Sequence, residues 1–231
     1  MGGDDAVFPM TTLQLQSHLA SASPEAKRAV LETLARRYWK PVYHFVRLSF
    51  AKTNEDSKDL TQAFFAWLLE RDLMARFDPS RSSFRTFLKG VLRNFAGNEW
   101  QAERRLKRGG GASPVPIDTA DAAAHGEEPD DAFDRLWLRG VLDGAIRRVR
   151  ARYEKRMRLV PYLVFEKLHF GTEDPPPSYD ALASQFGIKE SDVRNYLFEV
   201  RKAVREEVTA DLAGSGDSDL DIDTLGDVLS A

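Results

Sequence analysis

The chain has 231 residues, 42% of them hydrophobic, which is enough for one large or two small domains with buried cores. It has no cysteine, which excludes disulfides, thiolate zinc sites and thiol nucleophiles, and its four histidines are scattered. Because we find neither a long apolar run nor a secretory leader pattern, we expect a cytoplasmic protein without membrane insertion and without a cofactor.

The net charge of −3 conceals an uneven distribution. Residues 109–132 and residues 211–231 each hold six acids and no lysine or arginine. Without these twelve acids the rest of the chain carries +9. A basic folded body suggests a polyanionic partner, for whose surface the acidic segments could compete. The alternative is that both segments are simply a solvated linker and tail.

Helical periodicity recurs along the sequence and strand signals are nearly absent, which predicts an all-α fold. The first helix is expected to begin at Ser23, an N-cap candidate that is followed by Pro24 at the first helical position. Its apolar stripe consists of Val30, Leu31, Leu34 and Tyr38. Pro41 is expected to kink or divide this helix.

A second helix is expected within residues 56–72, with one broad buried face formed by Leu60, Phe64, Trp67 and Leu68. Residues 77–83 (FDPSRSS) predict a loop, because Asp-Pro followed by serines and arginine blocks helix continuation. A third helix is expected over residues 84–108. Its apolar positions are Phe84, Phe87, Leu88, Val91, Leu92 and Phe95, and its other face carries Arg85, Lys89, Arg93 and Asn94.

Glycine, proline and acidic residues then mark the domain boundaries. We predict a first helical domain over residues 1–108 and a flexible acidic linker over 109–132. A second helical domain follows over 133–210. The acidic tail, 211–231, is expected to be disordered, although its apolar residues could form one short docking helix.

The second domain has the spacing of a helix-turn-helix. Ala183 allows two helices to approach, Gly187 suits a turn with positive φ, and Val193 packs the second helix on the first. The inner stripe is Val193, Leu197, Val200 and Val204. The outward residues suit phosphates, base edges and thymine methyl groups, and they are Ser191, Arg194, Asn195, Phe198 and Arg201. Similar hairpins also occur in proteins that never bind DNA. The basic run over 147–158 could contact DNA backbone or form a solvated helix face.

Four segments, in this order, resemble the extracytoplasmic-function (ECF) sigma factors of bacteria. Residues 59–69 (DLTQAFFAWLL), 77–95 and 103–111 resemble region 2 of that family, and residues 178–204 resemble region 4. The resemblance covers about residues 24–208. It implies two small helical domains joined by a flexible linker, which bind core RNA polymerase and direct it to promoter DNA. An anti-sigma factor or another regulator is a further candidate partner.

By this resemblance, region 2 docks on the polymerase through an acidic patch at the start of its second helix. The corresponding residues here are Asp56, Asp59 and Gln62. Lys58 departs from the family, where an acid is common, and this implies a weaker electrostatic attraction. The two aspartates are also favourable near a helix N-terminus, so both roles can hold at once.

The resemblance also implies that the loop over 77–83 receives a flipped base of the −10 element and that Asn94 contacts DNA. Aromatic rings beside positive charge suit a melted strand. The expected −10 contacts are Phe77, Ser80, Arg81, Arg85, Lys89, Arg93, Asn94, Trp100, Arg104 and Arg105. Most aromatic residues of this region are nevertheless expected in the core, and Trp100 is the exception.

The helix-turn-helix would read the −35 element through its five outward residues, while the acidic linker would run through the active-centre cleft of the polymerase. Glu199 lies on the flank of this helix, where the family often carries a base. Its carboxylate could accept a hydrogen bond from cytosine, repel phosphate or face solvent, and we favour the solvent or rim position.

Two other functions remain open. A free-standing regulator would bind duplex DNA as a dimer through the helix-turn-helix, and would need no region-2-like domain. A nucleic-acid enzyme would need a carboxylate cluster for metal or a phosphate loop, and we find neither a GxxxxGK[ST] pattern nor a histidine cluster. We therefore predict a sigma factor that is not an enzyme.

Overall fold

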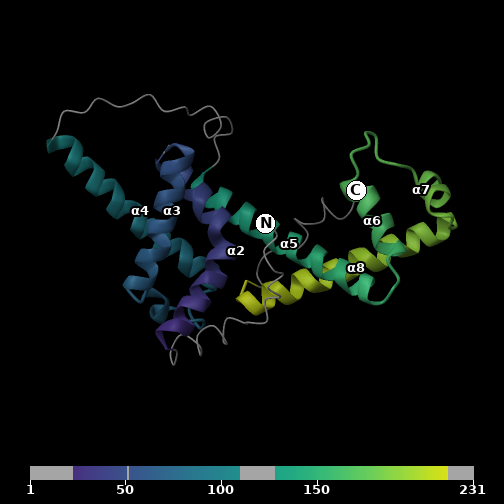
Figure 1. Cartoon of the computed structure of the whole chain (residues 1–231), viewed down its shortest axis with the longest axis horizontal. Helices are drawn as coiled ribbons and strands as arrows, with labels where there is room; N and C mark the ends of the chain where they lie inside the picture. Colours follow the sequence, from purple (N-terminus) through teal and green to yellow (C-terminus); the bar gives the residue numbers. More distant parts are fainter. Residues whose placement is uncertain (1–22, 51, 110–127, 218–231) are drawn as a thin grey trace. The chain divides into compact units, whose positions relative to one another are not determined.

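The computed structural model describes residues 23–50, 52–109 and 128–217, and within them the regular elements are all helical, which confirms the all-α prediction (Figure 1). The elements are α2 (Pro24–Phe50), α3 (Asn54–Glu70), the 3-10 helix η1 (Leu73–Arg76), α4 (Phe84–Gly109), α5 (Pro129–Lys155), α6 (Val160–Phe170), α7 (Tyr179–Phe186) and α8 (Glu190–Ser215). Residue contacts divide the chain into two compact units, Met1–Gly140 and Val141–Ala231, here called unit 1 and unit 2.

Two helices extend beyond the domain limits that the sequence predicts. Residues 129–132, expected in the linker, form the first turn of α5, and α8 continues past residue 210 to Ser215. A proline at the first helical position and two aspartates in the first turn favour this early start of α5. The rest of the predicted linker, 110–127, and of the tail, 218–231, lies outside the described residues.

The core of unit 1 forms where the apolar faces of α2, α3 and α4 meet. Phe64 of α3 is fully buried, and its ring meets that of Phe95 of α4 at 5.5 Å between centroids. Tyr38 of α2 packs edge-on against Phe84 of α4 at 5.6 Å. The buried members of the predicted stripes are Val30, Leu34, Tyr38, Phe64, Leu68, Phe84, Leu88, Leu92 and Phe95. Local periodicity therefore identified nine of the thirteen buried hydrophobic residues that the structure describes in α2, α3 and α4.

Pro41 does not divide α2, contrary to one of the two outcomes that the sequence predicts. The helix continues from Pro24 to Phe50 with Pro41 inside it. An internal proline costs about 3 kcal/mol because it removes a backbone hydrogen bond and crowds the preceding turn. Here the turns on both sides are buried, with Tyr38 and Val42 at 2% and 0% exposure. Tertiary packing on both sides of the proline thus stabilises the helix across it.

In unit 2, α7 and α8 form the two helices and the turn that the sequence predicts. Ser178 caps α7, since its hydroxyl accepts a hydrogen bond from the N–H of Ala181 at 3.2 Å. Gly187 ends α7 with a φ of +64°, as expected. At the start of α8 the carboxylate of Asp192 accepts from the N–H of Lys189 at 3.1 Å. The predicted inner stripe is buried, namely Val193, Leu197, Val200 and Val204.

We expect Gly187→Ala to lower the free energy of unfolding by about 1–2 kcal/mol, because an L-residue with left-handed φ pays that cost. A Cβ at Gly187 would meet no atom within 4 Å, so only the backbone contributes. Gly140→Ala is the matched control. Its Cβ also meets nothing within 4 Å, but it lies inside α5, where alanine should raise stability by about 0.5–1 kcal/mol. Urea denaturation measures the free energy of unfolding of both variants. If it changes in the same direction in both, Gly187 is not required for its positive φ.

Candidate nucleic-acid interface

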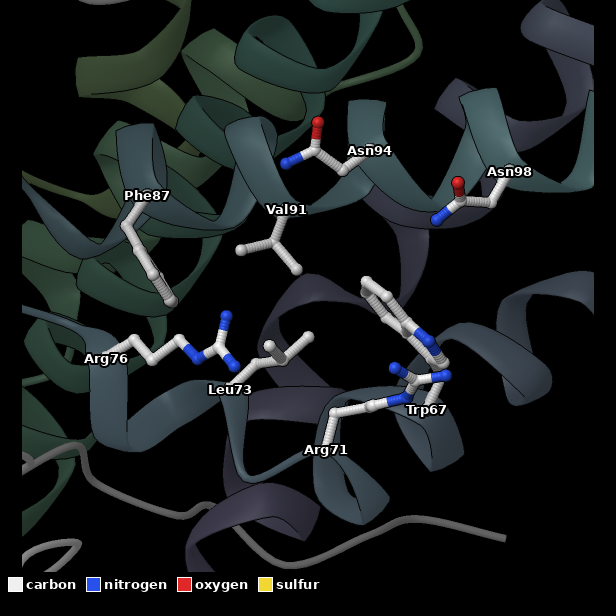
Figure 2. A pocket seen from close by; sticks show the side chains of 8 residues that line it. All are labelled: Trp67, Arg71, Leu73, Arg76, Phe87, Val91, Asn94 and Asn98. Carbon is white, nitrogen blue, oxygen red and sulfur yellow. The ribbon is translucent and has the colours of Figure 1, made fainter.

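A pocket of about 390 Å³ opens in unit 1 between the end of α3, the η1 segment and α4 (Figure 2). It is lined by Trp67, Arg71, Leu73, Arg76, Phe87, Val91, Asn94 and Asn98. This volume lies in the range that binds small organic ligands. The pocket is therefore the first candidate for a site that receives a base or a similar planar group.

Two aromatic rings form walls of this pocket and are supported from behind. Trp67 packs on Phe95 at 5.5 Å, and Phe87 packs on Phe77 at 5.4 Å between ring centroids. Rings that are held in this way lose little rotational freedom when a ligand stacks on them. Stacking of a base on an aromatic side chain contributes about 1–3 kcal/mol and tolerates any base sequence.

The polar groups of the pocket complement these rings. Asn94 and Asn98 lie one turn apart on α4, and both are exposed, so their amides can donate to and accept from a base edge. Arg71 and Arg76 are also exposed and supply guanidinium groups that suit phosphate. The combination of stacking surface, amide and cation is the chemistry that a single nucleic-acid strand requires.

The sequence identified only one residue of this pocket as a DNA contact, Asn94. Trp67 and Phe87 were predicted as core, although both are only partly buried and contribute to the lining. Asn98 was not singled out. The signal that could have identified it is its position four residues after Asn94, which places both amides on one helix face.

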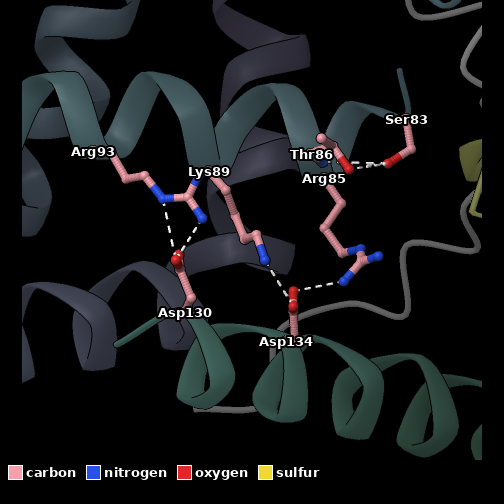
Figure 3. A network of polar contacts seen from close by, with 7 residues as sticks. All are labelled: Ser83, Arg85, Thr86, Lys89, Arg93, Asp130 and Asp134. Carbon is pink, nitrogen blue, oxygen red and sulfur yellow. Dashed lines mark hydrogen bonds and ion pairs between the residues drawn. The ribbon is translucent and has the colours of Figure 1, made fainter. Parts of the chain in front are cut away.

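The three basic residues Arg85, Lys89 and Arg93 lie on another face of α4, where aspartates of α5 pair with them (Figure 3). Arg85 Nη1 and Lys89 Nζ donate to the two carboxylate oxygens of Asp134, at 2.5 and 2.7 Å. Arg93 donates to Asp130 through Nε at 3.1 Å and also through Nη2. The side chains of Arg85 and Lys89 are only 13% and 15% exposed.

The structure thus separates residues that the sequence places on one −10 surface. At about 100° per residue, Asn94 projects about 140° away from Lys89 around the helix axis. The pocket and the basic residues therefore face different directions. Arg85 and Lys89 were predicted to contact DNA, but in this conformation both are paired with the single carboxylate of Asp134 and their side chains are largely covered. Asp134 lies 45 residues after Lys89, so a local sequence pattern could not predict this pairing.

The predicted loop over 77–83 supplies exposed polar groups but no aromatic surface. Phe77 is 3% exposed and packs edge-on against Phe84 at 5.2 Å, so its ring is inaccessible to a base, contrary to prediction. Ser80 and Arg81 are exposed. The side chain of Asp78 accepts hydrogen bonds from the hydroxyl and then from the N–H of Ser80, and these lower the pKa of Asp78.

The later part of α4 carries three more predicted −10 contacts. Trp100 is 50% exposed, which agrees with the expectation that it is not a core residue. Arg104 and Arg105 lie on the same helix, but their side chains are outside the described residues. Of the eight predicted −10 contacts whose side chains the structure describes, Asn94 is the one that lines the pocket.

The proposed docking residues Asp56, Asp59 and Gln62 are exposed on α3. Their spacing of three residues places them close together along one side of the helix. Asp56 also belongs to the cap of α3, because the hydroxyl of Thr53 accepts from its N–H at 3.2 Å and donates to its carboxylate at 2.9 Å. Asp56 is thus a structural residue as well, whereas Asp59 and Gln62 lie beyond the cap.

The two residues that depart from the sigma-factor pattern each have an ion-pair partner. Lys58 Nζ lies 2.9 Å from the carboxylate of Glu55, which raises the pKa of Lys58 through the hydrogen bond and the charge. Glu199 pairs with Arg158 at 3.3 Å, and its side chain is 43% exposed. The rim position that the sequence favoured for Glu199 agrees with this geometry.

The outward face of α8 keeps four of the five predicted −35 contacts exposed, and they are Ser191, Arg194, Asn195 and Phe198. Phe198 is 69% exposed, so its ring is accessible to a thymine methyl group. Arg194 bonds to Glu190 on its own helix and lies 5.7 Å from the ring centroid of Tyr179 in α7. Its guanidinium is therefore positioned at the junction of the two helices.

Arg201, the fifth predicted contact, faces α6 instead of solvent. It is half-buried, and its Nε lies 3.3 Å from Nε2 of His169. Burial and then the charge of Arg201 lower the pKa of His169 to about 4, so the imidazole is neutral at pH 7 and accepts this hydrogen bond. The ring of His169 also packs on Phe165 at 4.7 Å. Arg201 is thus mainly a packing residue.

We expect acid to destabilise unit 2 through His169. A pKa that is lower in the folded state means that the unfolded state binds the proton more readily, so stability is present above pH 6.5 and is lost as the pH falls towards 4. His169→Gln, which accepts a hydrogen bond but does not titrate, should flatten the stability profile in this window. Thermal melts at several pH values measure the effect, and an unchanged slope in the variant would contradict it.

The basic run over 147–158 is engaged mainly within unit 2. Arg148 bonds to Glu207 and Asp211 of α8, both at 2.8 Å. Arg150 pairs with Glu154 at 2.8 Å and Glu166 at 3.2 Å. Arg152 and Arg158 each pair with a glutamate of α8. Most of this charge is therefore balanced locally, which weakens the interpretation of the run as a contact with DNA backbone.

No protein-family model matches the sequence, and no curated protein or solved structure matches it either. Among the described helices, none has the length and apolar character to cross a membrane. In the same part of the chain, no three histidine or acidic side chains gather in a way that could hold a metal ion. Functional inference therefore depends on the geometry of the pocket and of the outward face of α8.

Proposed function

We propose that this chain is an ECF-type sigma factor, a promoter-specificity subunit that acts with bacterial core RNA polymerase in the cytoplasm and has no catalytic residues of its own. The proposal is supported by two surfaces of different chemistry in one chain, each of which suits a different form of nucleic acid. The outward face of α8 suits duplex DNA, and the pocket beside Asn94 suits a single strand. A regulator that binds only duplex DNA has no use for the second surface.

In this proposal unit 2 reads the −35 element and unit 1 holds an unpaired base of the −10 element. Unstacking a base costs a few kcal/mol. Stacking on Trp67 or Phe87 returns about 1–3 kcal/mol, and a hydrogen bond to Asn94 adds about 0.5–1.5 kcal/mol. These gains roughly balance the cost of unstacking. The pocket can therefore hold a base that has already left the duplex, whereas opening of the duplex requires the polymerase.

The docking surface in this proposal is the exposed set Asp56, Asp59 and Gln62 at the start of α3. The two carboxylates of this set attract a basic partner over a distance and favour a fast encounter. Because Asp56 also bonds to Thr53, the N-cap residue of α3, Asp59 and Gln62 are the residues whose variants report on docking alone.

Run-off transcription with core polymerase on a promoter library tests the proposal. Adding the protein is expected to produce selective initiation that core polymerase alone does not give. No selective initiation would refute it. The alternative, a free-standing regulator, predicts instead that the protein alone binds a specific duplex as a dimer and has no measurable affinity for core polymerase.

A further inference from the structure

We propose that Asp130 and Asp134 cover a second nucleic-acid surface of α4 in the free protein, and that a single DNA strand displaces them. This surface, Arg85, Lys89 and Arg93, is called the α4 strip. The inference rests on the proposed function, since it takes a melted strand as the ligand. It assigns a regulatory role to the start of α5, which the sequence places partly in the linker.

The two carboxylates of the cover bind the three cations of the strip in the way that phosphates would. Asp134 uses one oxygen for Arg85 and the other for Lys89, while Asp130 binds Arg93 (Figure 3). The cations recur every four residues, about 6 Å apart along the helix axis, and so do the two aspartates. Both carboxylate and phosphate offer anionic oxygens to these donors. A strand that replaces the aspartates also releases its own counterions, which favours the exchange at low salt.

The contact of α5 with α4 leaves two buried polar atoms without a hydrogen-bond partner among the described residues. They are the indole N–H of Trp137, whose side chain is 1% exposed, and Oδ1 of Asp130. Each such atom has lost its contact with water without gaining a hydrogen bond in return, which destabilises the contact. This cost offsets part of the stabilisation that comes from burying Phe133 and Trp137. A permanent interface normally satisfies such groups, so the contact is suited to exchange.

The covered state has a functional consequence. Arg85 and Lys89 are largely buried beneath α5, and so a strand cannot reach them while Asp134 is in place. The cover therefore lowers the affinity of the free chain for nucleic acid of any sequence. The strip becomes accessible only when a competing strand is present at high concentration, which the promoter complex supplies by holding the strand close.

The first test uses the wild-type protein and a carbodiimide, which activates a carboxylate so that a nearby amine forms an amide and the activator leaves as a urea. Lys89 Nζ and Asp134 are 2.7 Å apart and should be coupled in the free protein. A single strand of about 12 nucleotides should lower this cross-link about tenfold, as measured by mass spectrometry. The pair Lys167–Glu173 in unit 2, at 2.6 Å, is the internal control. If the strand leaves the first cross-link unchanged, the cover is not displaced and the inference fails.

The second test compares two double variants with the same change in net charge. Asp130→Asn with Asp134→Asn removes the cover charge. Asp131→Asn with Asp143→Asn removes two exposed charges from the same helix. Fluorescence anisotropy should show that the first variant binds the strand about tenfold more tightly than the second, with a steeper salt dependence. Equal affinities, or no binding by either variant, would overturn the inference. If the first variant does not fold, the cross-link in the wild type decides.

The two proposals can fail separately. If strand binding lowers the cross-link but core polymerase shows no selective initiation, the proposed function is wrong and the inference about the cover still holds. If initiation is selective but neither the cross-link nor the affinities respond, the cover alone is wrong.

Discussion

Asp59→Lys is expected to reduce the affinity for core RNA polymerase by at least about 30-fold, or about 2 kcal/mol, without unfolding the protein. Asp59 is exposed on α3, near Gln62. Reversal of its charge replaces attraction to a basic partner by repulsion. It lies beyond the first turn, where the helix dipole contributes little, so the stability of α3 should be nearly unchanged. Titration of labelled core polymerase measures the affinity.

Glu70→Lys is the matched control for this prediction. Glu70 is the last residue of α3, is exposed, and undergoes the same change of charge. Its variant should bind polymerase like the wild type, and Asp59→Asn should give an intermediate loss. If the two lysine variants bind equally well, the start of α3 is not the docking surface.

Asn94→Ala is expected to leave polymerase binding intact and to reduce promoter opening by about 10- to 100-fold. Asn94 lines the pocket from α4 (Figure 2). A hydrogen-bonded contact to a base edge is worth about 1–3 kcal/mol, which alanine removes while the stacking walls remain. Permanganate footprinting of unpaired thymines measures opening.

Two comparisons locate this effect. On a template whose −10 segment is already melted, Asn94→Ala should recover most of its activity if the amide acts in opening. Asn195→Ala, on the outward face of α8, should instead weaken binding to the −35 duplex and leave opening from a bound complex unaffected. Normal opening by the Asn94 variant would show that the pocket does not receive the base.

Helix positions and inner faces were predictable from sequence because they depend on neighbours within a few residues. The stripe Val193, Leu197, Val200 and Val204 follows from helical periodicity, and the structure buries it. Gly187 was predictable for the same reason, since a turn between two helices needs a residue that tolerates positive φ. An exposed Phe198 on the opposite face also followed from this periodicity.

The sequence by itself determined that the chain is helical, where most helices run, and which faces are apolar. Only the tertiary structure decided which charges have partners. In the sequence, Arg85 and Lys89 cannot be distinguished from basic residues that are exposed to solvent. In the structure they bind Asp134, which belongs to a helix much later in the chain. Arg201 likewise donates a hydrogen bond to His169. Such pairs depend on which faces of distant helices pack together, and long-range packing is what a local pattern does not contain.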